Sequence, residues 1–461
     1  MSTRRGFRIA TGARVITGAA IAVGCVLAVV LGAGAPLPGI QNAPDVSTVT
    51  PVPGDTVIVC NGSFRALGRD SVRAESMVSA AGPTLTIDRS QGEPVVAEIA
   101  MPDLAGGAGA QSLTGVVTDR VAPLLSASES MTVDAEDMKG YAAAPCREPA
   151  TSSWLVGGDV STGASDVIIL SNPGDVPATI QLDVYGEARG ATTTVVDAGT
   201  QIAVPLASIA AGEPRPVVRV TSSGVPIRAS LQSSLIRTLD PVGIDVQDGM
   251  SGPQGHLTLL GVQASDSAGD DATGVVLRVL SPESAAQAVV RVRPVGGSAT
   301  DVEEFPVDLV ADVPAELALS GLEPGVYDVE IDGTSPLVAA VRQTVRDGSQ
   351  ADFAWMTAAP EIAAETAFTV PRGPSPVLHL KNAGVADVSV GLSGASDEQQ
   401  VLVPAGTTIS MPLRGGTSWR LSPAGPVQAS VTMNGGEDAA ALAGWPLTPS
   451  AVPQQPIDVR P

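Results

Sequence analysis

The chain has 461 residues, of which 44% are apolar and only 3% aromatic, and its formal net charge is −22. A chain of this length is expected to hold roughly three or four domains, whose cores would be aliphatic. The acidic excess excludes nucleic acid as an expected partner, because phosphate binding requires clustered Lys and Arg side chains.

The N-terminal region predicts a membrane-spanning helix. Four arginines lie within residues 1–14 and precede an almost wholly apolar run at 15–35. At 1.5 Å per residue, about 21 residues span roughly 31 Å, which is the thickness of a hydrocarbon core. Basic residues keep their end of such a helix in the cytoplasm. We therefore expect a single-pass protein of the cell membrane, with its N-terminus inside and the bulk of the chain extracytoplasmic.

Two alternatives to an uncleaved anchor remain open at this stage. Ala33 and Ala35 are small residues of the kind that a signal peptidase requires, although Pro36 would follow the cut and hinder cleavage. Acylation of Cys25 would instead give a lipoprotein, but the apolar run continues to Leu31, where a mature lipoprotein turns polar.

Beyond Cys25 the sequence has only Cys60 and Cys146. An even pair in an oxidising compartment predicts a disulfide, which would stabilise the fold by about 4 kcal/mol on the chain-entropy model. A redox or metal-binding pair is the alternative, but these cysteines have neither CxxC spacing nor a nearby His.

Residues 36–54 are rich in Pro, Gly, Ser, Thr and Val and are typical of a juxtamembrane linker. A β-domain is predicted at 55–150, with candidate strands at 56–60, 84–88 and 95–101.

A cassette of about 100 residues then recurs three times. Its plainest segment is 198–206 in the first copy and 405–413 in the third. The three cassettes and the tail, which is rich in Pro and Gln and predicted to be disordered, occupy 151–250, 251–348, 349–447 and 448–461.

Within each cassette a short apolar run is followed by a turn and then by alternation of period two, as in Ile180, Leu182 and Val184. A second turn near the end of each cassette, such as 222–226, predicts a closing hairpin. Short strands separated by turns are typical of β-sandwiches. The predicted fold class is all-β, with tandem immunoglobulin-like β-sandwich domains of about six to eight strands each, behind one N-terminal transmembrane helix.

Large rings and histidines in the cassettes have structural interpretations. Trp154 and Trp355 open their cassettes at similar positions, and His256 corresponds to them in the middle copy. We expect these rings to pack in the fold; carbohydrate stacking is the alternative. His379 alternates with apolar neighbours on a strand. Because the two histidines lie in different cassettes, a Ser-His-Asp site is not expected.

Catalytic, cofactor-binding and metal-binding residues are predicted to be absent, because no nucleotide-binding, zinc or EF-hand motif occurs. Adjacent carboxylates are the remaining candidates for glycosidic chemistry or a Ca²⁺ site, although such acids are usually solvated. They are Glu303 with Glu304, Asp270 with Asp271, and the group of Asp134, Glu136 and Asp137.

The chain resembles the DUF5719 family of actinobacterial proteins of unknown function. The residues that carry the resemblance are 59–63 with 67–70, 140–146 with 153–158, and 170–179 with 184–186 and 231–235. The resemblance implies a membrane-anchored envelope protein, commonly encoded near a glycosyltransferase and mannose-metabolism genes. It implies no activity and no functional residues. Family members often have Pro after the first cysteine, where this chain has Asn61.

The function expected from the sequence is a non-enzymatic extracytoplasmic scaffold or accessory protein of the cell envelope, linked to glycan assembly. Its expected partners are envelope proteins or cell-wall glycan. One alternative is an array of carbohydrate-binding modules, which requires exposed aromatic rings. The other is a carboxylate-dependent hydrolase of wall polymers, which requires two acids facing each other in a cleft.

Overall fold

The computed structural model describes residues 6–34, 47–49, 51–68, 76–265, 274–297, 301–347, 350–394, 397–436, 440–450 and 457–459. The chain divides into two units. One comprises Met1–Pro51 with Gln454–Pro461, and the other comprises Val52–Pro453.

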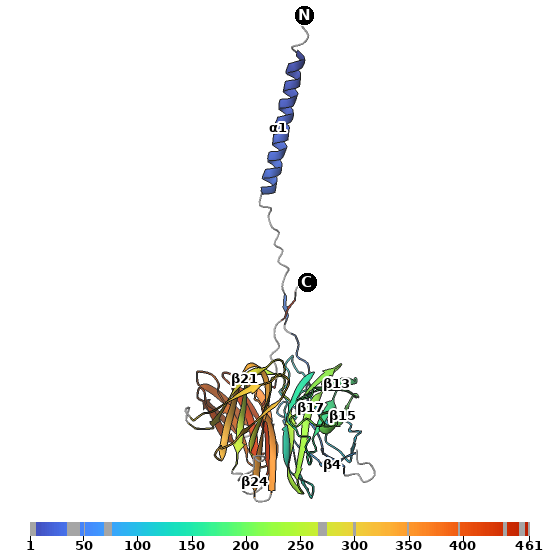
Figure 1. Ribbon diagram of the computed structural model, residues 1–461, viewed down its shortest axis with the longest axis vertical. Helices are drawn as coiled ribbons and strands as arrows, with labels where there is room; N and C mark the ends of the chain where they lie inside the picture. The colour runs from blue at the N-terminus through green and yellow to red at the C-terminus, as the bar shows by residue number, and fades with distance from the viewer. Residues whose placement is uncertain are drawn as a thin grey trace. The chain divides into compact units, whose positions relative to one another are not determined.

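The first unit contains helix α1 (Gly6–Gly34) and a short β-ribbon (Figure 1). The span Arg14–Ala33 is long and apolar enough to cross a membrane, and none of it is buried in the protein. Strand β1 (Ser47–Val49) pairs antiparallel with β35 (Ile457–Val459). These three residues of the tail are therefore in a strand, contrary to our prediction of disorder, because their backbone groups find partners in the segment predicted to be a linker.

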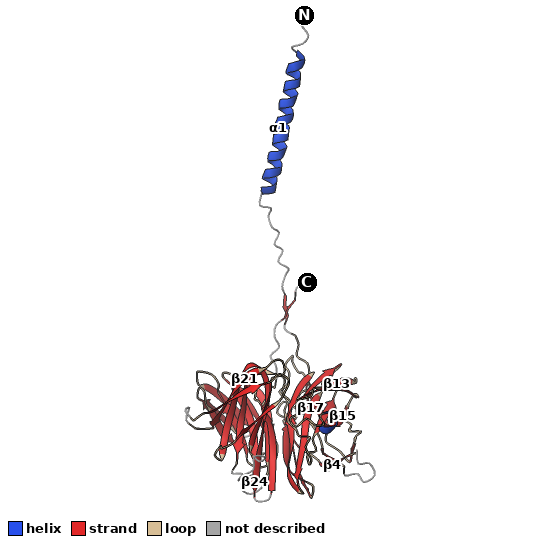
Figure 2. Ribbon diagram, in the orientation of Figure 1, coloured by secondary structure: helices blue, strands red, loops and turns tan. Residues whose placement is uncertain are grey.

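The second unit consists almost entirely of strands (Figure 2). Its described residues include one helix, the four-residue α2 (Leu206–Ile209). The low helix content agrees with the prediction from periodicity.

The N-terminal segment of this unit forms small sheets. In the described residues each has three strands, in the orders β10-β9-β5, β2-β8-β6 and β3-β4-β7. The strands are β2 (Thr56–Val59), β3 (Phe64–Leu67), β4 (Met77–Ala81), β5 (Thr84–Ile87), β6 (Val95–Glu98), β7 (Leu104–Ala105), β8 (Gln111–Gly115), β9 (Ala127–Ala135) and β10 (Met138–Pro145).

The first cassette forms two sheets of four strands in the described residues, ordered β11-β16-β13-β14 and β15-β12-β17-β18. The strands are β11 (Ser152–Val156), β12 (Val167–Asn172), β13 (Ala178–Tyr185), β14 (Gly190–Val196), β15 (Thr200–Pro205), β16 (Val217–Ser223), β17 (Arg228–Arg237) and β18 (Asp240–Asp248).

The second cassette repeats this pairing, except that one long strand, β24, contributes to both sheets. Its strands are β19 (Gln254–Ala264), β20 (Val275–Leu280), β21 (Ala286–Pro294), β22 (Glu303–Leu309), β23 (Ala315–Leu319), β24 (Gly325–Asp347) and β25 (Gln350–Thr357).

The third cassette repeats it again, in the sheets β27-β32-β29-β30 and β26-β33-β28-β31, with β34 paired to β33. Its strands are β26 (Glu361–Ile362), β27 (Thr366–Val370), β28 (Pro376–Lys381), β29 (Val388–Gly394), β30 (Glu398–Val403), β31 (Thr408–Pro412), β32 (Thr417–Pro423), β33 (Val427–Asn434) and β34 (Leu442–Pro446).

The turn near the end of each cassette does not close a hairpin, which corrects the sequence-based prediction. In the first cassette β16 pairs with β11 and β13, whereas β17 pairs with β12 and β18. The turn therefore carries the chain from one sheet to the other. Alternation of period two does not distinguish these cases, because both strands turn their apolar side chains toward one core.

That core is aliphatic and is shared by both sheets. Leu170, Leu182, Val220 and Leu231 come from β12, β13, β16 and β17 and lie in one buried cluster. Buried clusters that contain aromatic as well as aliphatic side chains fill the second and third cassettes.

Asn172 and Asn382 show how closely the first and third cassettes agree. The Nδ2 of Asn172 donates to the carbonyls of Val176 at 2.8 Å and Val196 at 3.0 Å, and its Oδ1 accepts from the Gly174 N–H at 2.9 Å. Asn382 makes the equivalent three bonds at the same distances. Asn172 thus ties the turn after β12 to the end of β14, and Asn382 ties the turn after β28 to the end of β30.

We expected a row of separate domains, but the cassettes are not separate from one another. Strands β10, β18, β25 and β34, here called the central strands, each come near the end of one of the four segments and contact one another in cyclic order. Residues Val52–Pro453 accordingly form one compact unit. The segments pack directly against one another because their cores are continuous. Trp154 and Tyr185 of the first cassette, for example, lie in the core cluster of the second.

Backbone pairing also places Trp355 differently from our expectation. Trp355 lies in β25, which pairs with β24, so by hydrogen bonding it closes the second cassette. The strand of the third cassette that corresponds to β11 and β19 is β27, because these three strands pair with the corresponding strands β16, β24 and β32.

Candidate functional site

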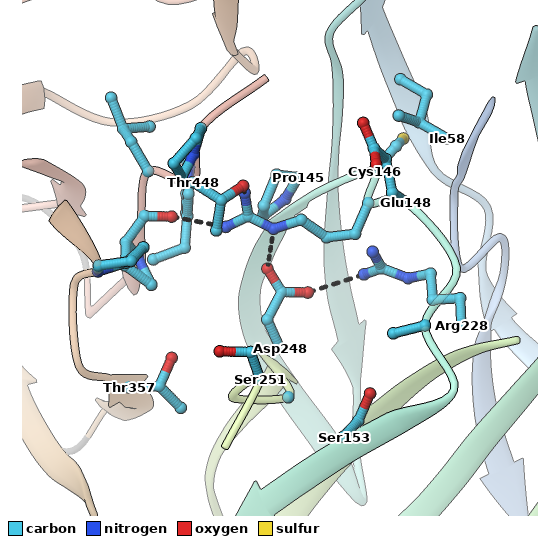
Figure 3. Close-up of a pocket in the computed structure, with 18 of the residues that line it drawn as sticks. Ile58, Pro145, Cys146, Glu148, Ser153, Arg228, Asp248, Ser251, Thr357 and Thr448 are labelled. Atoms are coloured by element: carbon cyan, nitrogen blue, oxygen red, sulfur yellow. Dashed lines mark hydrogen bonds and ion pairs between the residues drawn. The ribbon is translucent and has the colours of Figure 1, made fainter. Parts of the chain in front are cut away.

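A cavity of about 280 Å³ lies where the four central strands end (Figure 3). Pro145, Asp248, Thr357 and Pro446, the last residues of β10, β18, β25 and β34, all line it. The carboxyl ends of the four strands thus meet at one place, although the four residues are spread over some 300 positions of sequence. We take this cavity as the candidate functional site.

The central strands are held together by the buried carboxylate of Asp352. Its Oδ2 accepts from the backbone N–H groups of Tyr141 at 2.9 Å and Leu442 at 3.0 Å, and its Oδ1 accepts from that of Ile244 at 3.1 Å. One side chain of β25 therefore bonds to each of the other three central strands. Burial raises the pKa of Asp352 well above its ordinary value, and the N–H donors act in the opposite direction.

Two glycines make room for this carboxylate. A Cβ atom on Gly140 or on Gly243 would lie 2.6 Å from Oδ1 of Asp352. Both residues also have positive φ, 151° and 143°, which side chains disfavour. The two positions therefore require glycine for space as well as for backbone conformation.

Asp245 makes a second link between central strands. Its Oδ2 accepts from the N–H of Trp355 at 2.7 Å, and the residue is only 2% exposed. Burial raises its pKa to about 8. β18 and β25 are thus joined twice, once by an acid from each strand.

An ion-pair cluster forms one wall of the cavity. The carboxylate of Asp248 accepts from Nε of Arg147 and from Nη2 of Arg228, both at 2.8 Å (Figure 3). Arg147 also donates to Oγ1 of Thr448 and to the carbonyl of Pro446, both at 2.5 Å. These contacts tie the N-terminal segment, the first cassette and the third cassette together. Burial lowers the pKa of Arg147, and Asp248 opposes that change.

Another buried acid, Glu129, lies near Arg228. Glu129 accepts from the Asn61 N–H at 2.8 Å, from Asn61 Nδ2 at 2.6 Å and from the Gly62 N–H at 3.1 Å. Asn61 Oδ1 in turn accepts from Ser230 Oγ at 2.6 Å and from Arg228 Nε at 3.2 Å. Burial raises the pKa of Glu129, and the charge of Arg228 opposes this. Asn61 therefore joins the N-terminal segment to the first cassette.

The predicted disulfide is present and adjoins the cavity. Cys60 and Cys146 are bonded, with their Cα atoms 4.4 Å apart. Cys146 lines the cavity and immediately precedes Arg147. The bond therefore fixes the end of β10, from which Arg147 reaches Asp248.

Both histidines have partners outside this cavity. His379 is buried between Ser410 Oγ at 2.7 Å and Thr432 Oγ1 at 2.8 Å, and burial lowers its pKa to about 4. His256 is exposed and lies 2.7 Å from Asp332.

The tryptophans do not form an exposed aromatic surface. Trp154, Trp355, Trp419 and Trp445 are all 3–6% exposed. Guanidinium groups also lie against two of these rings: Arg219 lies 5.5 Å from the Trp154 ring centroid and Arg278 4.8 Å from that of Trp355. The carbohydrate-binding alternative requires exposed aromatic rings, and none of these four tryptophans provides one.

The acids singled out in the sequence are not brought together at the cavity. Glu304 pairs with Arg291 at 2.8 Å on the exposed part of β22, and Asp134 pairs with Lys139 at 3.0 Å. Glu303, Glu136 and Asp137 also do not line the cavity. Asp270 and Asp271 lie outside the described residues. Among the described residues no group of three or more His, Cys, Asp or Glu side chains is placed to hold a metal ion.

Sequence reasoning missed the residues that build the site. Asp245, Asp352 and Arg228 are charged residues that each lie between two apolar neighbours within a strand or at its start. A charge at such a position is rarely buried without a partner, so each interruption of the apolar pattern was a usable signal.

A family model described as "Family of unknown function (DUF5719)" matches residues 103–424. The chain belongs to this family. The matched span includes β10, β18, β25 and both Arg228 and Asp248, but it ends before β34. No curated protein matches the sequence.

A solved structure, the FN1-FN3 domains of chicken CNTN1, is 13% identical and covers 68% of this chain and 98% of its own. Its TM-score of 0.11 is too low to carry an argument about this DUF5719 protein. The apolar N-terminal helix, as anchor or signal, together with the disulfide indicates a secreted or membrane-anchored protein.

Proposed function

We propose that this DUF5719 protein is a non-enzymatic accessory or scaffold protein of the cell envelope, held in the membrane by an uncleaved α1 with its N-terminus in the cytoplasm. The unit Val52–Pro453 would lie outside the membrane, each cassette being an immunoglobulin-like sandwich. Its partners would be envelope proteins or cell-wall glycan close to glycan assembly.

The observation that supports this proposal is that the buried charged side chains connect segments of the protein. Asp352, Asp245 and the pair Arg147–Asp248 each join different segments of one compact unit. Side chains held by such bonds contribute to a fixed arrangement of segments, which suits a protein that presents a surface to partners.

Membrane topology tests the first half of the proposal. Cys25 lies inside the apolar helix, so cysteine labels should be introduced at exposed positions instead, for example Asp175→Cys. In intact cells we expect a membrane-impermeant maleimide to label this variant, and the protein to stay in the membrane fraction with its α1 intact. Recovery of a soluble mature chain would contradict an uncleaved anchor.

Crosslinking in intact cells tests the accessory role. We expect a photo-crosslinker at exposed positions of the unit to capture an envelope protein or glycan of the assembly machinery. Release of shortened fragments from purified wall polymer by the purified full-length protein would contradict a non-enzymatic role.

A further inference from the structure

The cavity at the ends of the central strands contains buried polar atoms that have no hydrogen-bond partner among the described residues. They are Nη1 of Arg228, Oγ of Ser126 and Oγ1 of Thr369. All three residues line the cavity, and they are 3%, 8% and 3% exposed. They come from the first cassette, the N-terminal segment and the third cassette. Buried polar groups in folded proteins are almost always bonded, so three such atoms around one cavity call for an explanation.

The hydrogen-bonding capacity of these atoms indicates which kind of ligand could bind to them. Nη1 of Arg228 only donates, and the hydroxyls of Ser126 and Thr369 donate as well as accept. Asp248 already accepts from both Arg228 and Arg147, so two guanidinium groups share this one carboxylate. Glu148 also lines the cavity but is exposed, and it forms no ion pair with the described residues.

The rest of the lining is mostly apolar. Phe368, Trp445, Met250 and Ile227 are buried side chains at its wall. A cavity of about 280 Å³ whose lining combines apolar with polar side chains approaches the usual size of small-molecule sites.

We propose that this cavity binds a small organic acid, whose carboxylate or phosphate oxygens accept from Arg228 Nη1, Thr369 Oγ1 and Ser126 Oγ while its apolar part lies against Phe368 and Trp445. This extends the accessory role proposed above by giving the exported unit a ligand. The binding test does not depend on the anchor or on any partner protein, so either proposal can fail alone.

Binding is measured by calorimetric titration of the full-length protein in detergent with benzoate, with phenyl phosphate and with neutral benzyl alcohol. We expect at least one of the two anions to bind at one site per chain, at least about tenfold more tightly than the alcohol. The comparison of benzoate with phenyl phosphate decides which oxyanion is preferred. Equal affinity for the alcohol, or no binding of either anion at millimolar concentration, would overturn the proposal.

Three conservative variants locate the site. Thr369→Val and Ser126→Ala each remove a hydroxyl that has no hydrogen-bond partner among the described residues, so we expect unchanged thermal stability and about three- to tenfold weaker anion binding. Ser128→Ala is the matched control, because Ser128 Oγ is also buried and without a partner in the described part of the chain, but the residue does not line the cavity. A control variant that weakens binding as much as Thr369→Val would place the ligand elsewhere.

Discussion

The carboxylate of Asp352 accepts a hydrogen bond from the backbone N–H of Tyr141 at 2.9 Å, across a sequence separation of 211 residues. The same carboxylate bonds to Ile244 and Leu442, so a single side chain serves the other three central strands. Loss of this carboxylate should therefore affect the whole unit rather than one cassette.

We expect Asp352→Ala to destabilise the unit by at least about 3 kcal/mol, because three buried N–H groups would lose their acceptor. Asp352→Asn should cost less, since its amide oxygen can still accept. Urea denaturation followed by circular dichroism measures both. Asp175→Ala, at an exposed position, is the control and should leave the midpoint unchanged; a similar midpoint for Asp352→Ala would refute the linking role of Asp352.

The stability of the unit should depend on the protonation of Asp245. Its pKa is about 8 in the folded state and 3.8 ordinarily, so between these values the folded chain retains a proton that the unfolded chain releases. Its contribution to stability is therefore present at low pH and is lost as pH rises toward about 8. Asp166, with a pKa of about 7, acts in the same direction. His379 acts in the opposite direction, but only between about pH 4 and 6.5.

From pH 7 to pH 8.5 we accordingly expect the urea midpoint of the wild type to fall, and that of Asp245→Asn to fall less. An identical pH dependence for the two proteins would show that Asp245 does not titrate in this range.

The disulfide between Cys60 and Cys146 should contribute substantially to the stability of the fold. Cys60 and Cys146 are separated by 86 positions, and closing a loop of that length stabilises the fold by about 4 kcal/mol on the chain-entropy model. We expect Cys60→Ser with Cys146→Ser to lower the urea midpoint to about the value of the reduced wild type. Cys25→Ser is the control, because Cys25 is not in the disulfide. If reduction leaves the wild-type midpoint unchanged, the bond is not a significant constraint.

Asn172 and Asn382 should respond alike to substitution. Each makes three hydrogen bonds to backbone groups with the same distances in its own cassette. We expect Asn172→Ala and Asn382→Ala each to cost about 2 to 4 kcal/mol, with the two values agreeing within about 1 kcal/mol. Thermal unfolding of the two variants tests this, and a large effect for one with none for the other would show that the turns are not equivalent.

Much of the local structure was determined by the sequence itself. The apolar helix, the aliphatic cores, the strands at 167–171 and 275–280 and the turns after them follow from composition, periodicity and turn residues, because these are short-range properties. The disulfide between Cys60 and Cys146 also followed, since no other cysteine of the exported part could pair.

Only the tertiary structure decided which strands share a sheet and how the cassettes meet. Period-two alternation is identical for a hairpin and for a crossover between sheets. The strands that pair with β16 and β17 could therefore not be predicted from this alternation. The arrangement of the central strands depends on bonds such as those of Asp352, whose partners lie 90 to 211 residues away. The local sequence does not show which distant backbone N–H groups an acid such as Asp352 will bond to. These groups need an acceptor only when they are buried, and they are buried only after all four segments have packed together.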